Sequence, residues 1–347
     1  MEFRIGNRPV GPGHPTYVIA EAGANHNRDL GTARELIDVA ADAGADAVKF
    51  QTYSGASIYS TKTPRFDYLA PVTDKPPSEL LEDISLPREW QPGLAAYARE
   101  RGIDFFSTPF DFDAVRELDA LDVPVLKVAS FELVDLTLIR RVAETGRPLI
   151  LSTGMAVMGE IEDALRAARE AGASAIGLMQ CTSVYPAPAE RINLRAMATM
   201  ERAFGVPVGL SDHSLGTAVP IAAAALGAAF VEKHYTLSRA MEGPDHPFAL
   251  EPDELRAMVA GIREAQAALG NGRKEGPSPE EAGEMYVLGR RSLIAVRELP
   301  AGTVLERDMI TVKRPGFGIP PKHLDLVVGR PLKVAVEADE ILTWDMV

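Results

Sequence analysis

The sequence has few of the features that place a protein outside the cell or in a membrane. It contains one cysteine, Cys181, in 347 residues, so no disulfide can form within the chain. Disulfides are rare in reducing compartments, and cysteine usage this low is typical of a cytoplasmic protein. No stretch approaches the roughly 20 apolar residues that span a bilayer, and the start, MEFRIGNRPVGPGHP, lacks the apolar region of a signal peptide. We therefore expect a cytoplasmic globular protein with no membrane partner.

Positive charge is also scarce. The chain has 36 Lys and Arg residues against 49 Asp and Glu residues, which gives a net charge of −13. Non-specific nucleic-acid binding needs a basic surface that displaces counterions, so we expect no nucleic-acid partner. A small anionic substrate is still compatible with this charge, because a few buried lysines can make a locally positive pocket.

The first 270 residues alternate between short apolar runs and amphipathic helical segments. The apolar runs are residues 17–21, 47–51, 104–108, 125–129, 149–153, 175–179, 208–212 and 230–234. Segments typical of helices lie between them, among them 30–43, 90–101, 161–171 and 252–269. Eight strand–helix pairs in about 250 residues predict an α/β fold, the (β/α)8 TIM barrel. A doubly wound sheet is the competing fold, but residues 21–27 lack its usual G-x-G-x-x-G turn.

The remaining segments suggest a second, smaller domain. We expect a barrel domain over residues 1–270 with an N-terminal extension at 1–16, a Gly/Pro/Glu-rich linker at 271–289, and a small β-rich domain at 290–347. The apolar runs of this small domain are residues 292–296, 310–313 and 332–336. Residues 53–87 form a long insert after the second strand, and loops of this length are usually functional or mobile, so the insert is a candidate lid.

Several of the barrel strands turn polar at their C-terminal ends, where barrel enzymes carry their catalytic groups. The examples include Glu21, Lys49, Gln51, Thr108, Lys127, Ser152, Ser211, His213 and His234. The start of a loop explains serine and threonine at these positions. It does not explain lysine and glutamate within a strand, because unpaired charges are costly to bury. The pattern therefore favours an active site at the strand ends.

His213 and His234 end the last two strands, which are neighbours in a closed barrel. Two imidazoles with oxygen ligands suit Mn, Fe, Co or Zn, and such a metal can polarise a carbonyl group. The alternative is a pair of hydrogen-bonded histidines that line a cleft. On the residues alone, both interpretations stay open.

Lys49 and Lys127, if they point inward near Ser130, Ser152 and Ser211, would make a cradle for phosphate and carboxylate groups. The alternatives are lysines that extend to solvent or the Schiff-base lysine of an aldolase, which usually needs no metal. Carboxylates that could exchange protons in the site are Glu21, Glu132 and Asp245, although each could instead cap a helix or lie at the surface. Cys181 could supply a thiol, but a lone cysteine is more often buried and inert.

These residues lie within longer motifs that resemble one family. The motifs are IAEAGANHN (19–27), DAVKFQTY (46–53), FFSTPFD (105–111), LKVASFE (126–132), ILSTGM (150–155), CTSVYP (181–186), GLSDHSLG (209–216), EKHYTL (232–237) and GPDHPFALEP (243–252). In this order they resemble the sialic acid synthases, and RRSLIAVRELPAGTVL (290–305) with KRPGFGI (313–319) resembles that family's antifreeze-like, or SAF, domain of the β-clip type. The resemblance covers almost the whole chain. It implies an N-acetylneuraminate-type synthase that condenses phosphoenolpyruvate with N-acetylmannosamine or a related amino sugar and releases phosphate.

The resemblance also implies a role for each matching residue. Phosphoenolpyruvate would contact Lys49, Lys127, Thr108, Ser130, Ser152, Ser183 and Ser211. A divalent metal, manganese or magnesium with cobalt as a further candidate, would bind His213 and His234. The N-acylated amino sugar would contact Gln51, Glu132, Tyr185 and Asp245, and also Arg314 from the second subunit of a domain-swapped homodimer. Glu21 would orient or deprotonate water, and Glu21, Lys49, Lys127 and Asp245 would form the catalytic set. Ser183 departs from the asparagine of several family members.

Three alternatives remain at this stage. Within the family, a pseudaminic or legionaminic acid synthase would use a diacetamido-hexose, and ASFELVDL (129–136) resembles that branch at least as well. Another phosphoenolpyruvate-condensing barrel, such as 3-deoxyoctulosonate phosphate synthase, would need extra Arg or Lys for the substrate phosphate and no SAF domain. A non-catalytic sugar-binding protein would be expected to have lost the histidines or lysines.

Overall fold

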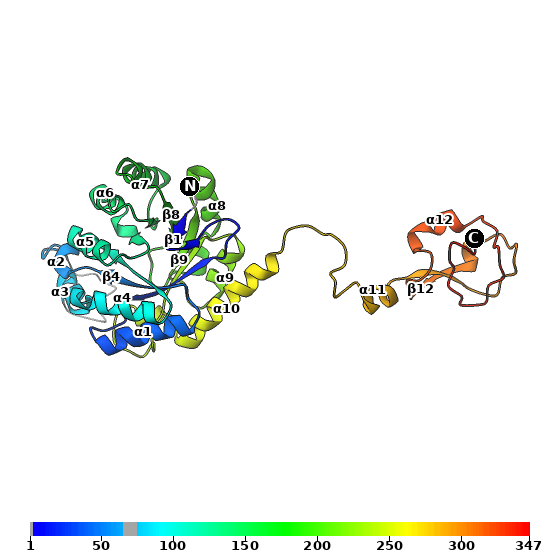
Figure 1. Ribbon diagram of the computed structural model, residues 1–347, viewed down its shortest axis with the longest axis horizontal. Helices are drawn as coiled ribbons and strands as arrows, with labels where there is room; N and C mark the ends of the chain where they lie inside the picture. The colour runs from blue at the N-terminus through cyan, green and yellow to red at the C-terminus, as the bar shows by residue number, and fades with distance from the viewer. Residues whose placement is uncertain (1–2, 65–74) are drawn as a thin grey trace. The chain divides into compact units, whose positions relative to one another are not determined.

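The computed structural model, which describes residues 3–64 and 75–347, contains the expected parallel barrel (Figure 1). Eight parallel strands form one sheet in the order β5-β4-β3-β10-β9-β8-β7-β6. The strands are β3 (Tyr17–Gly23), β4 (Ala47–Thr52), β5 (Asp104–Pro109), β6 (Leu126–Val128), β7 (Leu149–Ser152), β8 (Ile176–Cys181), β9 (Val208–Asp212) and β10 (Phe230–His234). β5 and β6, the two ends of this order, pack against each other, so the barrel is nearly closed. The predicted barrel is confirmed.

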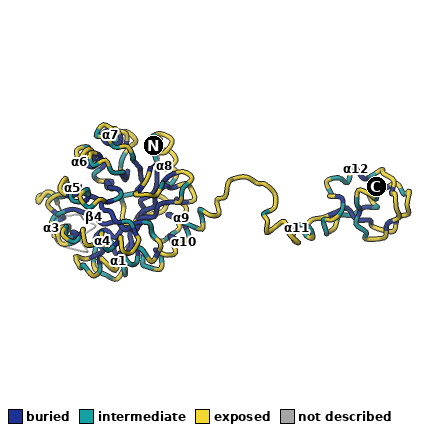
Figure 2. The backbone as a smooth tube through the Cα atoms, viewed as in Figure 1, coloured by how far each residue is buried: buried dark blue, intermediate teal, exposed yellow. Residues whose placement is uncertain are grey.

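Helices surround the strands, and their inner faces are buried while their outer faces are exposed (Figure 2). They are α1 (Leu30–Asp42), α4 (Gln91–Glu100), α5 (Phe112–Ala120), α6 (Leu136–Ala143), α7 (Met158–Glu170), α8 (Arg195–Phe204), α9 (Ala218–Ala225) and α10 (Pro252–Leu269). α1 buries Ala33, Leu36, Ile37 and Ala40, the three- and four-residue spacing of one helical face. Within residues 3–64 and 75–347, no helix has both the length and the apolar character needed to cross a membrane.

Two segments of the first unit lie outside this alternation. β1 (Arg4–Ile5) and β2 (Arg8–Pro9) form a short antiparallel hairpin before the barrel. The insert expected to act as a lid contains α2 (Gly55–Ile58) and α3 (Pro77–Ile84), so part of it is helical. Residues 65–74 of that insert lie outside the described residues.

The chain divides into two compact units, residues 1–270 and 271–347. The second has its own apolar core, and contains α11 (Glu284–Gly289), α12 (Leu324–Val327) and an antiparallel pair, β11 (Ser292–Ala295) with β12 (Ile310–Lys313). The prediction of a strand at residues 332–336 is wrong, because these residues make only an isolated bridge between Val336 and Leu299. The backbone amide of Lys333 donates to the carbonyl oxygen of Met346 instead. The backbone of this run therefore forms hydrogen bonds with several different segments and not with a single strand.

Candidate active site

A polar pocket lies at the C-terminal ends of the barrel strands. The predicted residues that line it are Glu21, Lys49, Gln51, Thr108, Lys127, Ser130, Ser152, Tyr185, Ser211, His213 and His234. The strand register brings them together, because Glu21 is level with Lys49 on one side and with His234 on the other. Side chains two residues apart on a strand share a face, so Gln51 follows Lys49 into the same pocket.

Two buried lysines form an ion-pair network inside this pocket. Lys49 Nζ lies 2.8 Å from Glu21 Oε2 and 2.9 Å from Thr108 Oγ1. Lys127 Nζ lies 2.8 Å from Glu232 Oε2, and the other oxygen of Glu232 is 3.8 Å from Lys49 Nζ. Both lysines are charged groups that could not remain buried without partners. The carboxylates therefore hold the two ammonium groups at the base of the pocket.

The same network gives its two carboxylates different proton affinities. Burial raises the pKa of Glu21 above its ordinary range, although the Lys49 ammonium acts against this shift. Burial acts on Glu232 in the same direction, but Lys127 and Lys49 outweigh it and hold the pKa of Glu232 low. Glu232 is therefore ionised at neutral pH, while Glu21 is the carboxyl that can bind and release a proton there.

Serine hydroxyls that follow several strand ends lie in the pocket or next to it. Ser152 Oγ and Ser183 Oγ are buried and have no hydrogen-bond partner within the described chain. Ser211 donates to Glu232 Oε1 over 3.1 Å, and Ser130 Oγ accepts the amide of Gly154 over 3.0 Å. Buried hydroxyls without partners are uncommon in native proteins. Together with the lysines, they provide donors for an anionic ligand.

The two histidines stand beside each other, with ring centroids 5.4 Å apart. His213 Nδ1 lies 3.0 Å from the carbonyl oxygen of Thr182, which fixes the ring and leaves Nε2 available. His234 Nδ1 is buried, has no hydrogen-bond partner in the part of the chain that the structure describes, and lies 3.7 Å from Asp245 Oδ2. Burial, together with the neighbouring His213 and Lys49, lowers the pKa of His234 well below its ordinary value, so the ring is neutral.

The donor set at the histidines is small. Over residues 3–64 and 75–347, no group of three or more His, Cys, Asp or Glu side chains is arranged to hold a metal ion. The neutral His234 ring, whose buried Nδ1 lacks a hydrogen-bond partner among the described residues, and the neighbouring His213 ring are nevertheless suitable ligands for a divalent cation. Such an ion would take its remaining ligands from water or substrate oxygen atoms.

Four predicted residues lie outside the group that lines the pocket. Ser183 follows β8 and lies near Ser130, and Asp245 precedes the turn His246–Phe248 beside His234. Glu132 lies in the turn Ser130–Glu132, where burial raises its pKa to about 7. Its Oε2 has no hydrogen-bond partner within residues 3–64 and 75–347. Arg314 is exposed and directly follows β12 in the second unit.

Glu232 was not among the carboxylates expected in the site, which were Glu21, Glu132 and Asp245. It lines the pocket and contacts Lys127, Lys49 and Ser211. The available signal was alternation along β10, since Glu232 lies two residues before His234 and shares its face. Lys233, between them, points away from the pocket and lies 2.6 Å from the buried Asp212.

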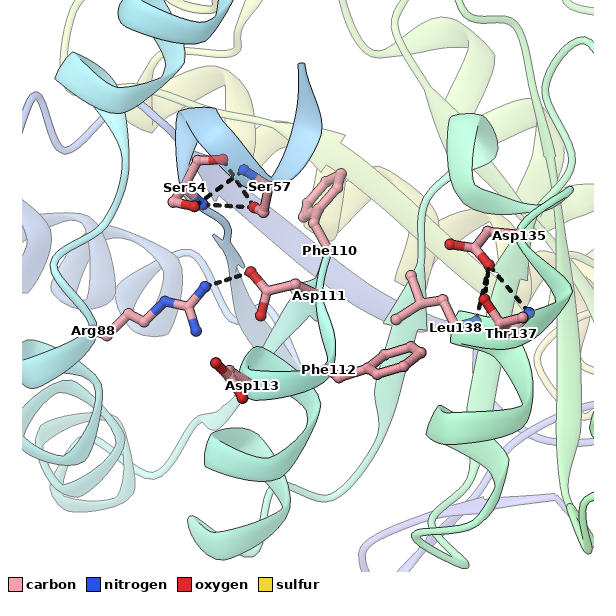
Figure 3. A pocket seen from close by; sticks show the side chains of 10 residues that line it. All are labelled: Ser54, Ser57, Arg88, Phe110, Asp111, Phe112, Asp113, Asp135, Thr137 and Leu138. Carbon is pink, nitrogen blue, oxygen red and sulfur yellow. Dashed lines mark hydrogen bonds and ion pairs between the residues drawn. The ribbon is translucent and has the colours of Figure 1, made fainter. Parts of the chain in front are cut away.

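A wider cavity of about 630 Å³, lined by residues that follow β4, β5 and β6, has different chemistry (Figure 3). Arg88 is already paired there with Asp111, at 2.5 Å. Asp111 and Asp135 accept the first amide groups of α5 and α6 as helix caps. No lysine or histidine is among its lining residues, so this cavity lacks the proton-transfer and anion-binding groups of the pocket at the strand ends.

Known proteins share this architecture, in which a barrel domain is followed by a SAF domain. The chain matches the NeuB family over residues 36–274 and the SAF domain over residues 290–347. It is 38% identical to the N,N'-diacetyllegionaminic acid synthase of Campylobacter jejuni, over 94% of this chain and 98% of that protein. It is 35% identical to the pseudaminic acid synthase of Helicobacter pylori, over 95% of this chain and 97% of that one. The structure of the N-acetylneuraminic acid synthetase of Leptospira borgpetersenii is similar with a TM-score of 0.73 and 34% identity, covering 82% of this chain and 95% of that one. The chain therefore belongs to the NeuB family.

Proposed function

We propose that the protein condenses phosphoenolpyruvate with an open-chain N-acylated amino sugar to form a nonulosonic acid and phosphate. Carbon three of phosphoenolpyruvate forms a bond with the aldehyde carbon of the sugar, water adds at carbon two, and the carbon–oxygen bond to phosphate breaks. The observation that carries this proposal is the pair of buried lysines beside unpartnered serine hydroxyls at the strand ends. A small molecule with both a phosphate and a carboxylate suits such a set of donors.

In this proposal Lys49 and Lys127 bind the anionic groups of phosphoenolpyruvate as point charges. Thr108, 2.9 Å from Lys49 Nζ, holds that ammonium in place. The hydroxyl groups of Ser130, Ser152, Ser183 and Ser211 complete the cradle. Ser152 and Ser183 support this role best, because their hydroxyl oxygens have no partner among the described residues.

The proton at the water that attacks carbon two goes to Glu21. Gln51 donates from Nε2 to Glu21 Oε1 over 2.7 Å, which fixes the carboxyl plane. Burial gives Glu21 a raised pKa, so its carboxylate can accept a proton near neutral pH. Asp245 is the second candidate for proton exchange, at the sugar, because burial also raises its pKa.

His213 and His234 would hold a divalent metal, with manganese, magnesium and cobalt as candidates. The orphaned Nδ1 of His234 and the proximity of the two rings support this assignment. A divalent cation bound there would polarise the sugar aldehyde. Tyr185 has its ring centroid 4.2 Å from that of His213 and 6.5 Å from that of His234, so a sugar that contacts Tyr185 would lie close to both histidines.

The sugar would contact Gln51, Glu132, Tyr185 and Asp245, and Arg314 from the second copy of a domain-swapped homodimer. Residues 271–289 would serve as the linker that carries the SAF domain to the partner. Exposure of Arg314 on a loop directly after β12 supports this part of the proposal. The single cysteine supports a reducing compartment, the cytoplasm, as the site of the reaction.

A second candidate substrate is a diacetamido-hexose, the kind of sugar a legionaminic or pseudaminic acid synthase would use. The 38% and 35% identities to synthases of those names support it, and the 34% identity to the N-acetylneuraminic acid synthetase of Leptospira borgpetersenii supports N-acetylmannosamine to a similar degree. The test is phosphate release from phosphoenolpyruvate with manganese and, in turn, N-acetylmannosamine and two diacetamido-hexoses. We expect one sugar to have the largest specificity constant, since a site can reject an analogue by pocket shape and unpaired polar groups. Phosphate release at the same rate without any sugar would overturn the proposal.

A further inference from the structure

Gly154, directly after β7, lies at the point where the loops of three strands meet. A Cβ atom built on it would be 2.3 Å from Ser183 Oγ and 2.8 Å from Ser130 Oγ. The φ angle of Gly154 is not in the left-handed region, so its backbone conformation would tolerate any residue. Glycine is therefore required here only by the lack of space for a side chain, since the space is occupied by the hydroxyl groups of Ser130, which lines the pocket, and of Ser183, which lies next to it.

The amide of Gly154 also acts on one of these hydroxyls. It donates to Ser130 Oγ over 3.0 Å, in a buried hydrogen bond. With an oxygen lone pair used in this way, the Ser130 hydroxyl keeps its own hydrogen for donation, either to the neighbouring Cys181 sulfur or to a bound anion. Ser183 Oγ is buried and has no partner among the described residues, so it too can donate to a ligand. Gly154 thus permits the close approach of both hydroxyls and orients one of them.

We propose that Gly154 is a positioning residue of the anion subsite, which sets the Ser130 and Ser183 hydroxyls as donors to the phosphate of phosphoenolpyruvate. This inference rests on the proposed function. A side chain at Gly154 would meet two hydroxyl oxygens that can rotate about χ1. The Cβ atom of Ser130, at 3.1 Å, would have to shift by only a few tenths of an ångström, so the barrel would still fold. The rotated hydroxyls would no longer point at the phosphate, and anion affinity would fall.

The test compares Gly154→Ala with Gly159→Ala as the matched control. Gly159 is exposed in the first turn of α7, and a Cβ there would have no atom within 4 Å. For Gly154→Ala we expect KM for phosphoenolpyruvate to rise at least about tenfold, the factor for one lost hydrogen bond to a charged group. KM for the amino sugar should stay within about twofold. Calorimetric titration with phosphoenolpyruvate alone should show the same loss of affinity, and Gly159→Ala should match the wild type in both measurements.

A double-mutant cycle with Ser183→Ala tests whether the effect runs through the hydroxyl. Ser183→Ala removes the atom closest to the new Cβ, so Gly154→Ala should cost less affinity in that background than in the wild type. Equal costs in both backgrounds would show that Gly154 does not act through Ser183 and would overturn the inference.

Two other outcomes would also overturn it. One is an unchanged phosphoenolpyruvate affinity in folded Gly154→Ala. The other is an equal rise of both KM values together with a lowered melting temperature, which would indicate general damage to the barrel. Failure of the proposed function looks different, because the wild-type protein itself would then neither bind phosphoenolpyruvate in the titration nor release phosphate from it.

Discussion

Lys127 Nζ lies 2.8 Å from Glu232 Oε2, and both side chains are almost fully buried. Replacing Lys127 with methionine keeps the length of the side chain but leaves the Glu232 carboxylate 3.8 Å from Lys49, without its closer partner. We expect Lys127→Met to lower the free energy of unfolding by about 3 kcal/mol, the usual cost of breaking a buried pair from one side. Urea denaturation measures this difference.

The matched control is the double variant Lys127→Met/Glu232→Gln, in which both charges are gone. We expect it to recover most of the lost stability, because the destabilising element is the uncompensated carboxylate rather than the missing lysine. A single variant as stable as the wild type would show that the pair contributes nothing to the fold.

Removing either histidine should remove the bound metal. We expect His213→Ala and His234→Ala, after loading with manganese and dialysis, to retain none, because a single imidazole is left to hold the ion. His323→Ala, in the second unit, is the control and should bind as the wild type does. Elemental analysis of the dialysed proteins gives the readout, and full metal content in either of the first two variants would refute the assignment.

Glu132 should make stability depend on pH. Its pKa is raised from 4.5 to about 7 by burial, so the folded state binds the proton more tightly than the unfolded state does between these values. The free energy of unfolding therefore falls as pH rises through this window, by about 3 kcal/mol in total. Glu132→Gln removes the titration. We expect its stability relative to the wild type to increase from pH 4.5 to 7 and then level off, and a constant difference would contradict the buried, unpaired state of Glu132.

Arg314 should act on the sugar alone. We expect Arg314→Ala to raise KM for the N-acylated sugar about tenfold, through loss of a hydrogen bond from a charged group, and to leave KM for phosphoenolpyruvate unchanged. Arg297→Ala, another exposed arginine of the same unit, is the control. Mixing Arg314→Ala with a barrel-defective Lys49→Met chain should restore some activity if the arginine comes from a second copy. Equal KM values for Arg314→Ala and the wild type would exclude the contact.

The sequence was sufficient for elements whose residues follow a simple period. The eight strands and the helix Pro252–Leu269 are found where apolar periodicity indicated them, because burial on one face imposes that spacing. The helices α2 and α3 were not predicted, since α3 begins at Pro77 in a proline-rich stretch that resembles a loop. The expected strand at 332–336 failed because its backbone partners come from separate segments, which periodicity along one chain cannot reveal.

The residues of the candidate site were likewise only partly predictable from the sequence. Strand-end polarity indicated most of the residues that now line the pocket, but not the central place of Glu232 or the need for glycine at position 154. Glu232 is defined by three partners on other strands. Gly154 is defined by the volume that two distant serines occupy. The alternation along β10 indicates which face Glu232 occupies, but its ion-pair partners and the volume around Gly154 arise only in the assembled barrel.

The alternation along β10 limits where the length of this chain can change during evolution. Glu232 and His234 face the pocket while Lys233 faces Asp212, so insertion or deletion of one residue within β10 would exchange the two sets. A cation would then replace a carboxylate beside Lys127, and a buried aspartate would lose its partner. Homologous sequences should therefore vary in length in connecting segments, such as the linker at residues 271–289, and keep the spacing within the strand itself.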